Sequence, residues 1–276
     1  MEYVTITPII LTKNEETNIS RCLASIPWPG AIVLDSGSTD ATVQVARDSG
    51  ATVLIHQQEG PFNIAEQRNW AIASCNIDSQ WILFLDADEE LTARTVDAIE
   101  EGCTCGDQYD GFELTPKYLF WGRWLKRTQG YPNWHCRLVK NVDRPFEGGV
   151  WEHFRGGLRV GRISEPYNHY GFSKGVSDWV ERHNRYSTWD GVRIHAFLQS
   201  GDTSNLGTRR KLRLRRIAAL FWPFRPIARF FHMYVWRMGF IEGVPGFVYC
   251  VLCMFYEFLT VCKINEHRRI GRGLPL

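Results

Sequence analysis

A run of consecutive apolar residues that ends in two acids constrains the fold of this 276-residue chain more than any other feature. Trp81–Leu85 is apolar without alternation, which is typical of a strand buried on both faces of a sheet. The run ends at Asp86 and Asp88, which one alanine separates, and two glutamates follow. Open α/β sheets bind ligands beyond the carboxyl ends of their strands. The sequence therefore predicts that both aspartates lie at a ligand-binding edge.

Two interpretations of this acid pair stay open on the residues alone. Carboxylate oxygens suit a hard divalent cation such as Mg²⁺, which often bridges a few carboxylates to substrate phosphates. Alternatively, the pair marks the start of a helix over Leu91–Ile99, with Asp88 as its N-cap and the glutamates favoured by the helix dipole. The helix accounts for Asp88 but not for Asp86, whose side chain follows a buried strand directly.

Strands alternate with helices through the first third of the chain. Three further strands are predicted from apolar and β-branched runs, at Tyr3–Leu11, Ala31–Leu34 and Ala51–Ile55. Periodic apolar positions predict helices between the strands, among them Ala41–Asp48 and Asn63–Cys75. This alternation predicts a largely parallel sheet with right-handed crossovers.

Asp35 and Arg68 are candidate nucleotide contacts. Asp35 follows the second strand and precedes Ser-Gly-Ser-Thr-Asp. An acid at such a strand exit commonly hydrogen-bonds a ribose or base in nucleotide-binding α/β folds, whereas the competing interpretation is a tight turn followed by a helix cap. Arg68 lies early in the helix predicted at Asn63–Cys75, where it would suit a diphosphate, although an exposed helix arginine is more often only solvated.

The middle of the chain is rich in aromatic residues. A dense aromatic stretch between residues 118 and 134 fits either a carbohydrate site, because sugar rings present apolar faces, or ordinary core packing. Strands are expected at Tyr109–Leu114 and His135–Lys140. The segment Phe146–Phe154 then places Glu147 and Glu152 among glycines and aromatic residues. Of the polar residues in this part, Glu152 is the strongest catalytic candidate.

The C-terminal part carries neighbouring basic and apolar segments. Residues 207–237 contain nine Arg or Lys and no Asp or Glu, and Phe247–Cys262 is apolar except for Glu257. That run is shorter than the ~20 apolar residues of a transmembrane helix. Basic charge beside apolar residues predicts a segment that lies on an anionic membrane surface. Nucleic-acid binding is the rival interpretation of the arginines, and a single buried core helix is the rival interpretation of the apolar run.

The N-terminal residues and the cysteines indicate the compartment. The sequence MEYVTITPIILTKNEE has neither the basic segment nor the small-residue cleavage site of a signal peptide. The eight cysteines show no secreted-type framework and no zinc-finger spacing, so we expect reduced thiols. We therefore expect a cytoplasmic protein, peripheral on the inner face of the cell membrane.

Several motifs together resemble those of a known enzyme family. PIILTKNEE after the first strand, DSGSTD after the second, the helix segment AEQRNWAI and the acidic LDADEE resemble the nucleotide-sugar domain of inverting glycosyltransferase family 2. The later segments CRLVK, VWEHF, NHYGFSK, RHNRYS and GFIEGVPG look like the lipopolysaccharide-core β-glucosyltransferase subfamily. The resemblance thus extends over nearly the whole chain.

The resemblance implies an α/β fold of the GT-A type, with a mixed, mainly parallel sheet flanked by helices and a C-terminal helical extension on the membrane. It implies a catalytic domain over residues 1–205, with a nucleotide-sugar half (1–102) and an acceptor half (103–205), and a tail over 206–276. Asp86 and Asp88 would serve the Mg²⁺ or Mn²⁺ site and catalysis. The nucleotide side would be formed by Asn14, Glu15, Asp35, Arg68 and Asp86.

The predicted activity is inverting transfer of a hexose such as glucose from a nucleotide diphosphate sugar, most readily a UDP-sugar, to a lipid-linked or lipopolysaccharide-type glycan. Inversion needs a carboxylate that takes the acceptor proton, and we assign Glu152, with Asp178 and Glu147 as reserves. One rival is a sugar-phosphate nucleotidyltransferase, which carries a glycine-rich loop after its first strand, whereas Ile9–Glu16 contains no glycine. The other rival is a non-catalytic membrane-binding protein with a degenerate nucleotide fold.

Overall fold

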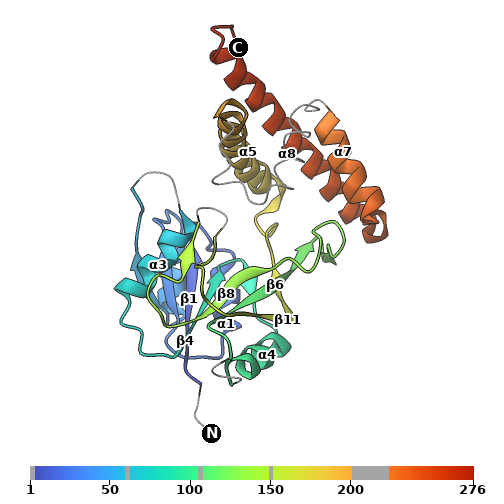
Figure 1. Cartoon of the computed structure of the whole chain (residues 1–276). Coiled ribbons are helices and arrows are strands. Elements are labelled where there is room, and N and C mark those ends of the chain that lie inside the picture. Colours follow the sequence, from blue (N-terminus) through green and yellow to red (C-terminus); the bar gives the residue numbers. More distant parts are fainter. Residues whose placement is uncertain (1–3, 60–62, 105–107, 149–151, 201–223) are drawn as a thin grey trace. The chain divides into compact units, whose positions relative to one another are not determined.

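A computed structural model of the protein describes residues 4–59, 63–104, 108–148, 152–200 and 224–276 (Figure 1). The chain divides into two compact units. One, called here the sheet unit, comprises Met1–Leu119 and Tyr131–Ser173, and the other, the helical unit, comprises Phe120–Gly130 and Lys174–Leu276. The boundary predicted at residues 205–206 lies outside the described residues.

The sheet unit is organised around one mixed β-sheet whose strand order is β3-β2-β1-β4-β8-β6-β11-β5. Strands β1, β2, β3 and β4 run parallel, as the alternation of strands and helices predicts. Strand β8 then lies antiparallel between β4 and β6, while β11 is parallel to β6 and antiparallel to the short β5. The strands are β1 (Ile6–Thr12), β2 (Ile32–Asp35), β3 (Thr52–Ile55), β4 (Trp81–Asp86), β5 (Glu89–Glu90), β6 (Gly111–Phe120), β8 (His135–Lys140) and β11 (Val160–His169).

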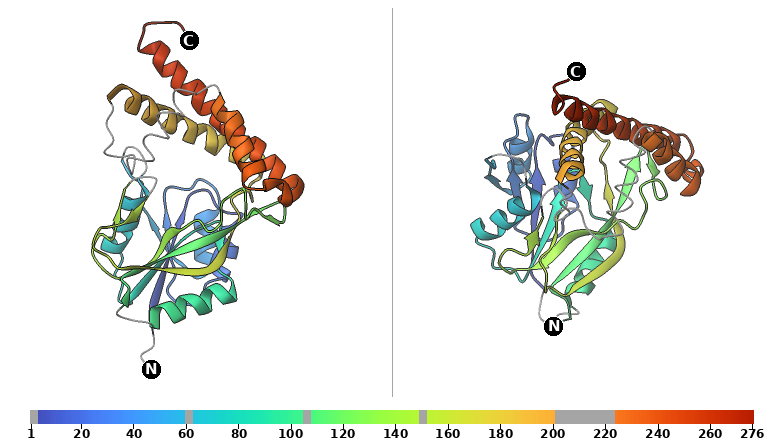
Figure 2. Two further views of the ribbon diagram at one scale, coloured as in Figure 1. Left: turned by 45° about the vertical axis from the view of Figure 1, so that its right-hand side comes forward. Right: turned by 45° about the horizontal axis from the view of Figure 1, so that its top comes forward.

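Two hydrophobic cores cover the two faces of this sheet. On one face, Trp81, Leu83 and Leu85 of β4 pack with residues of α1 (Ile19–Ala24), α2 (Thr42–Asp48) and α4 (Ala93–Thr104). The opposite face is covered by α3 (Ile64–Ser74) and the hairpin of β9 (Phe146–Glu147) and β10 (His153–Phe154), as Figures 1 and 2 show. Strand β4 is therefore buried on both faces, which confirms the interpretation of its unbroken apolar run.

The helix after Asp88 begins later than the N-cap interpretation requires. Glu89 and Glu90 form β5, which pairs with β11, and α4 begins only at Ala93. The cap is provided by Thr92, whose Oγ1 accepts a hydrogen bond from the backbone N–H of Thr95 at 3.1 Å. The alternative that made Asp88 the cap of a helix over Leu91–Ile99 is therefore wrong, because the strand pairing takes up the intervening residues.

The helical unit consists of long helices that pack along one another. It contains α5 (Gly175–Ser200), α7 (Arg225–Phe231), a π-helical turn (η3, His232–Trp236), a 3-10 turn (η4, Gly239–Glu242) and α8 (Gly243–Ile270), with β7 (Arg123–Trp124). Helix α8 packs against α5 and α7. The apolar run Phe247–Cys262 lies within α8, and it buries Tyr249, Cys250, Cys253 and Glu257. The Glu257 carboxylate forms an ion pair with Arg225 at 2.7 Å, which explains an acid in this run.

Among the described helices, one segment is long and apolar enough to cross a membrane, namely Gly239–Ile270. Core helices of soluble proteins share that property, and 39% of the most apolar window of this segment is buried within the protein. The interpretation of the apolar run as a buried core helix is thus correct for the face of α8 that packs against α5 and α7.

A buried histidine in β8 makes the stability of the fold depend on pH. Burial beside Arg137 lowers the pKa of His135 to about 3. An unfolded chain takes up this proton near pH 6.5 and the folded chain does not, so stability falls as the pH is lowered below about 6.5.

We expect His135→Gln to remove the part of the pH dependence of stability that is due to His135. Between pH 7.5 and 5.0, the wild-type protein should lose about 2 kcal/mol more unfolding free energy than the variant, since one bound proton corresponds to ~1.4 kcal/mol per pH unit. Urea unfolding at the two pH values measures the difference. Equal losses in both proteins would contradict the prediction.

Candidate functional site

Asp86 lies where β4 ends, between two arginines from neighbouring elements. Arg137 of β8 places Nη2 2.7 Å from Asp86 Oδ2, and Arg68 of α3 places Nη2 4.0 Å from Oδ1. The antiparallel register places these residues near each other, because Leu83, three residues before Asp86, pairs with Leu138, the neighbour of Arg137. Burial alone would raise the pKa of Asp86, but Arg137 and then Arg68 outweigh it and hold the pKa below its usual value. The side chain stays 33% exposed, so a ligand can reach it.

Glu89 and Arg137 form the buried part of the same network. The Glu89 carboxylate accepts hydrogen bonds from Arg137 Nη2 and from the backbone N–H of Asp86, the latter at 3.0 Å. Burial raises the pKa of Glu89 to about 7, despite the opposing effect of Arg137. Arg137 Nε also donates to the Tyr167 hydroxyl at 3.3 Å. Neither residue stands out as a site residue in the sequence, where the only signal is an arginine within the otherwise apolar strand His135–Lys140.

Arg68 brings Glu152 into this network. The Arg68 guanidinium is fully buried, and its Nη1 lies 2.9 Å from Glu152 Oε1 and 2.9 Å from the Cys136 carbonyl oxygen. It lies within 5.3 Å of the rings of Phe84 and Phe146. The alternative that Arg68 is a solvated surface arginine is therefore wrong. Within the described residues, its Nε and Nη2 have no hydrogen-bond partner, and Nη2 contacts only the Asp86 carboxylate, at 4.0 Å.

Asp88 is paired with a histidine from the far end of β11. The antiparallel pairing of β5 and β11 sets His169 opposite Glu89, and His169 Nε2 lies 3.3 Å from Asp88 Oδ2. Burial opposes a charge on the imidazole, but Asp88 above all raises the pKa of His169 to about 9. The backbone N–H of Tyr170 donates to the Asp88 carbonyl oxygen at 2.8 Å and fastens the two segments together. The motif NHYGFSK contained this signal, but a single histidine is more often structural.

The donor atoms of Asp88 and His169 fit a divalent cation. Carboxylate oxygens are the ligands that Mg²⁺ and Mn²⁺ prefer, and an imidazole nitrogen of His169 could join them once a bound cation displaces its proton. Across the described part of the chain, no three His, Cys, Asp or Glu side chains gather into a metal-binding group. A cation held by Asp88 and His169, with Asp86 nearby, would therefore take its other ligands from substrate phosphates and water, which is how Mg²⁺ commonly binds in phosphate sites.

Asp35 organises the turn after β2. Its Oδ1 accepts hydrogen bonds from the backbone N–H groups of Gly37 at 2.9 Å and Ser38 at 2.8 Å, and its Oδ2 accepts from the Ser38 hydroxyl. The tight-turn interpretation of this segment is therefore confirmed. The Asn14 backbone N–H donates to Ser38 Oγ at 2.7 Å, which joins the loops after β1 and β2. Glu15 accepts from Asn18 Nδ2 at 2.7 Å within the same pair of loops.

The two reserve carboxylates have partners elsewhere. Glu147 is exposed, and His153 lies 3.9 Å from it. Asp178 belongs to the helical unit, where Arg182 Nε lies 2.8 Å from its Oδ2. The structure thus gathers Asp86, Asp88 and Glu152 with Arg68 in the sheet unit, and it gives Glu147 and Asp178 other surroundings.

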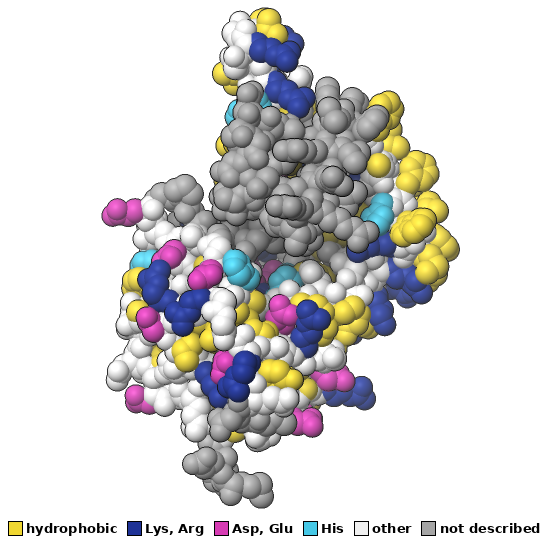
Figure 3. Space-filling model, viewed as in Figure 1, with side chains coloured by type: hydrophobic (Ala, Val, Ile, Leu, Met, Phe, Trp, Pro, Cys, Tyr) yellow, Lys and Arg dark blue, Asp and Glu magenta, His cyan; other side chains and the backbone are white. Residues whose placement is uncertain are grey.

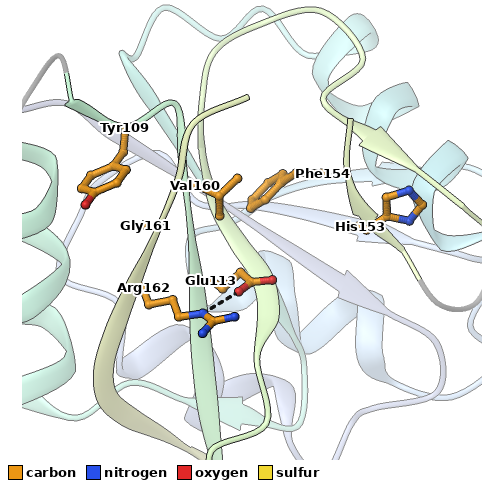
Figure 4. A pocket seen from close by; sticks show the side chains of 7 residues that line it. All are labelled: Tyr109, Glu113, His153, Phe154, Val160, Gly161 and Arg162. Atoms are coloured by element: carbon orange, nitrogen blue, oxygen red, sulfur yellow. Dashed lines mark hydrogen bonds and ion pairs between the residues drawn. The ribbon is translucent and has the colours of Figure 1, made fainter. Parts of the chain in front are cut away.

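A separate open hollow of about 550 Å³ lies near the beginnings of β6 and β11 (Figure 4). Glu113 and Arg162 form an ion pair across part of it, with 3.0 Å between Oε2 and Nε. None of the candidate residues named above lines this hollow, which is formed by Tyr109, Glu113, His153, Phe154, Val160, Gly161 and Arg162.

Comparison with known proteins identifies a family and several relatives. The family described as glycosyl transferase family 2 matches residues 7–160. An uncharacterized glycosyltransferase of Rickettsia conorii is 27% identical over 287 residues, covering 95% of this chain and 90% of that protein.

Among solved structures, S. aureus TarS 1–349 is similar with a TM-score of 0.42 and 14% identity, over 97% of this chain and 92% of that chain. A second similar structure is glucosyl-3-phosphoglycerate synthase of Mycobacterium tuberculosis, in complex with Mn²⁺, UDP and glucosyl-3-phosphoglycerate. Its TM-score is 0.39 and its sequence identity 20%, over 50% of this chain and 57% of that chain.

Removing Arg137 should destabilise the protein strongly, because it leaves Asp86 and Glu89 without their nearest positive charge. We expect Arg137→Met to cost about 3–5 kcal/mol of unfolding free energy, as is usual when one partner of a buried ion pair is removed. Adding Glu89→Gln should recover part of that loss. Urea unfolding of the single and double variants measures both effects.

Arg159→Met is the matched control, since Arg159 pairs with Asp110 at 2.9 Å on the surface. It should cost about 1 kcal/mol or less. Similar losses for Arg137→Met and Arg159→Met would show that the network contributes no more than a surface ion pair.

Proposed function

Because the chain belongs to glycosyl transferase family 2, we propose that it is a metal-dependent, inverting hexosyltransferase. Family membership establishes a nucleotide-sugar glycosyltransferase with a mixed, GT-A-like α/β fold. The proposed donor is a UDP-sugar that carries a hexose such as glucose. The proposed acceptor is a lipid-linked or lipopolysaccharide-type glycan at the cytoplasmic face of the membrane.

One observation carries this proposal: the Asp88–His169 pair lies beside an Asp86 whose charge Arg137 already balances. Asp88 and His169 are partly exposed, with 16% and 19% of their side-chain surfaces accessible, so they can take up a cation from solution. A bound Mg²⁺ or Mn²⁺ supplies Lewis-acid stabilisation of the charge that develops on the leaving nucleotide diphosphate. Asp86, with its charge balanced, can then contact the ribose side of the donor.

The nucleotide is proposed to lie over the carboxyl ends of β1 and β2. Asn14 and Glu15 come from the loop after β1, and Asp35 from the turn after β2, as in other α/β sheets that bind nucleotides at this edge. The unpaired N–H groups of Arg68 are donors that a donor-substrate oxygen can satisfy. Leaving such buried donors unsatisfied costs free energy, which favours a ligand with acceptor atoms there.

Glu152 is the proposed base for the acceptor hydroxyl. Inverting transfer by direct displacement requires one carboxylate to take the proton of the attacking hydroxyl. The Arg68 guanidinium holds the Glu152 carboxylate at 2.9 Å and so orients it beside the Asp86 network. Its place in the network favours Glu152 over the two reserves, Glu147 and Asp178.

Membrane association is proposed for the helical unit, as a way to reach a lipid-anchored acceptor. The basic stretch at residues 208–216 lies outside the described residues. Within the described residues, the unit exposes large apolar side chains together with arginines, which supports a lipid surface over nucleic acid as the partner. A nucleotidyltransferase is disfavoured by the family to which the chain belongs.

Asp88→Asn tests the metal role. The substitution keeps the shape of the side chain but removes its charge, so the fold should survive while turnover falls at least ~100-fold, because metal-held charge stabilisation contributes several kcal/mol. Hydrolysis of a panel of nucleotide sugars, with and without a chelator, measures the effect. Asp110→Asn, at a surface ion pair, is the control and should retain activity. Full activity in Asp88→Asn or in the chelator would exclude the metal role.

Glu152→Gln tests the base. The amide keeps the contact with Arg68 and cannot accept a proton, so donor binding should persist while transfer falls by roughly 10²–10⁴-fold. Single-turnover transfer and nucleotide-sugar binding, measured on the same preparation, separate the two effects. Glu147→Gln and Asp178→Asn serve as comparisons. Normal transfer by Glu152→Gln, together with a loss in either comparison variant, would reassign the base.

A further inference from the structure

We propose that one end of the helical unit inserts into the interface of an anionic lipid bilayer. This end is formed by residues 224–247 and by the loop 120–130, which is hydrogen-bonded to them. This surface is called the tip below. The inference rests on the proposed function, because the proposed lipid-linked acceptor is the reason for the enzyme to bind a membrane. It differs from the sequence-based expectation, because that expectation placed the apolar contact at Phe247–Cys262.

Large apolar side chains gather on the tip and point away from the protein. The Trp236 side chain is 81% exposed and Val244 is 68% exposed, which is unusual for residues of this kind. They come from consecutive turns of α7, η3, η4 and the start of α8, and the most prominent are Phe231, Val235, Trp236, Phe240, Ile241 and Val244. Figure 3 shows hydrophobic side chains gathered along the side where α7 and the start of α8 lie, with Lys and Arg side chains beside them.

The tip is a rigid surface rather than a loose end. A Cβ added to Gly246 would lie 2.5 Å from the Gly239 carbonyl oxygen, so the first turn of α8 packs tightly against η4. The buried Glu242 carboxylate accepts hydrogen bonds from the backbone N–H of Arg127 and from the hydroxyl of Thr128, the latter at 2.6 Å. The loop 120–130 is thereby fastened to the helices. Because these contacts hold the backbone of the tip in place, insertion needs little further ordering of the backbone.

The charge exposed on the tip is positive. Glu242 is the only acid within residues 120–130 and 224–247, and it is buried and fully engaged by the loop. The exposed basic residues of these segments include Arg123, Lys126, Arg127 and Arg229. Basic side chains beside an apolar insertion surface are attracted by anionic lipid headgroups. A tryptophan among them suits the headgroup region, where amphipathic rings concentrate.

Two other occupants of this surface are less favourable. A second copy joined through the tip by a two-fold axis would bring the same arginines from both chains together, since such an interface is built from the same patch twice. A spanning α8 would have to release its packing against α5 and α7, where Cys250, Cys253 and Glu257 are buried. A bilayer interface satisfies both the apolar and the basic residues without disturbing either contact.

The test compares two full-length variants in vesicle co-sedimentation. The tip variant carries Trp236→Ser, Phe240→Ser and Ile241→Ser, and the control variant carries Phe255→Ser and Phe258→Ser, which change exposed apolar residues of α8 beyond the tip. With vesicles of phosphatidylcholine and phosphatidylglycerol, we expect the tip variant to lose at least tenfold in partition coefficient and the control to stay within about twofold of wild type. All three proteins should bind pure phosphatidylcholine vesicles more weakly.

Hydrogen exchange of the wild-type protein provides a second measurement that needs no variant. Residues 224–247 should gain protection when the anionic vesicles are added. The proposal is overturned if the tip variant binds as wild type does, if the control variant loses as much, or if the exchange of this segment is unchanged. Release of the protein from the vesicles by detergent alone, and by neither salt nor alkali, would indicate a spanning helix and overturn the proposal. A lipid-free dimer in light scattering that the tip variant abolishes would indicate a second copy at the tip and overturn it as well.

Hydrolysis of UDP-glucose in solution separates this inference from the proposed function. None of the substituted residues belongs to the site around Asp86, so the tip variant should retain the hydrolysis rate of the wild type. Vesicle binding through the tip without any nucleotide-sugar hydrolysis would refute the proposed function and leave the inference standing. Nucleotide-sugar hydrolysis without vesicle binding would refute the inference and leave the proposed function standing.

Discussion

The buried contact of Arg137 with Asp86 and Glu89 is the interaction on which the candidate site depends. Two carboxylates that meet at the end of a buried strand repel each other and lose hydration, and neither can stay charged there without a nearby cation. Arg137 comes from β8, the strand that turns the parallel first half of the sheet into a mixed one. The reversal of strand direction at β8 therefore has an electrostatic consequence, because it delivers a guanidinium to the acidic end of β4.

Arg68 extends this balance of charge to the other face of the sheet. Its guanidinium is enclosed by Phe84 and Phe146 and reaches Glu152, so that a carboxylate from the β9–β10 hairpin segment joins a network centred on β4. The charges alternate in sign along the chain of contacts from Glu152 through Arg68 to Asp86, Arg137 and Glu89. A network of this kind holds each carboxylate in one orientation, which is what a site that binds a diphosphate and directs a hydroxyl requires.

Sequence patterns predicted the first four strands well because the signal there is local. The run Trp81–Leu85 and the exits at Asp35 and Asp86 needed only knowledge of their immediate neighbours, and β8 was predicted at its observed bounds. The contributions of Arg137 and His169 could not be predicted in the same way. Each depends on a pairing between segments roughly 50 to 80 residues apart, β8 with β4 and β11 with β5. The packing of α5 against α8 is likewise a contact between segments far apart in the sequence, which local patterns do not reveal.

The short strand β5 has a further consequence for the behaviour of the chain in solution. It closes one end of the sheet with two residues, Glu89 and Glu90, of which Glu90 accepts hydrogen bonds from the Asn168 amide and the Tyr170 hydroxyl. An open sheet edge is a template on which another chain can add a strand, and short, charged edge strands are a recognised protection against it. The segment that carries the acidic residues after β4 therefore also terminates the sheet, and its short, charged edge disfavours the addition of a strand from a neighbouring molecule.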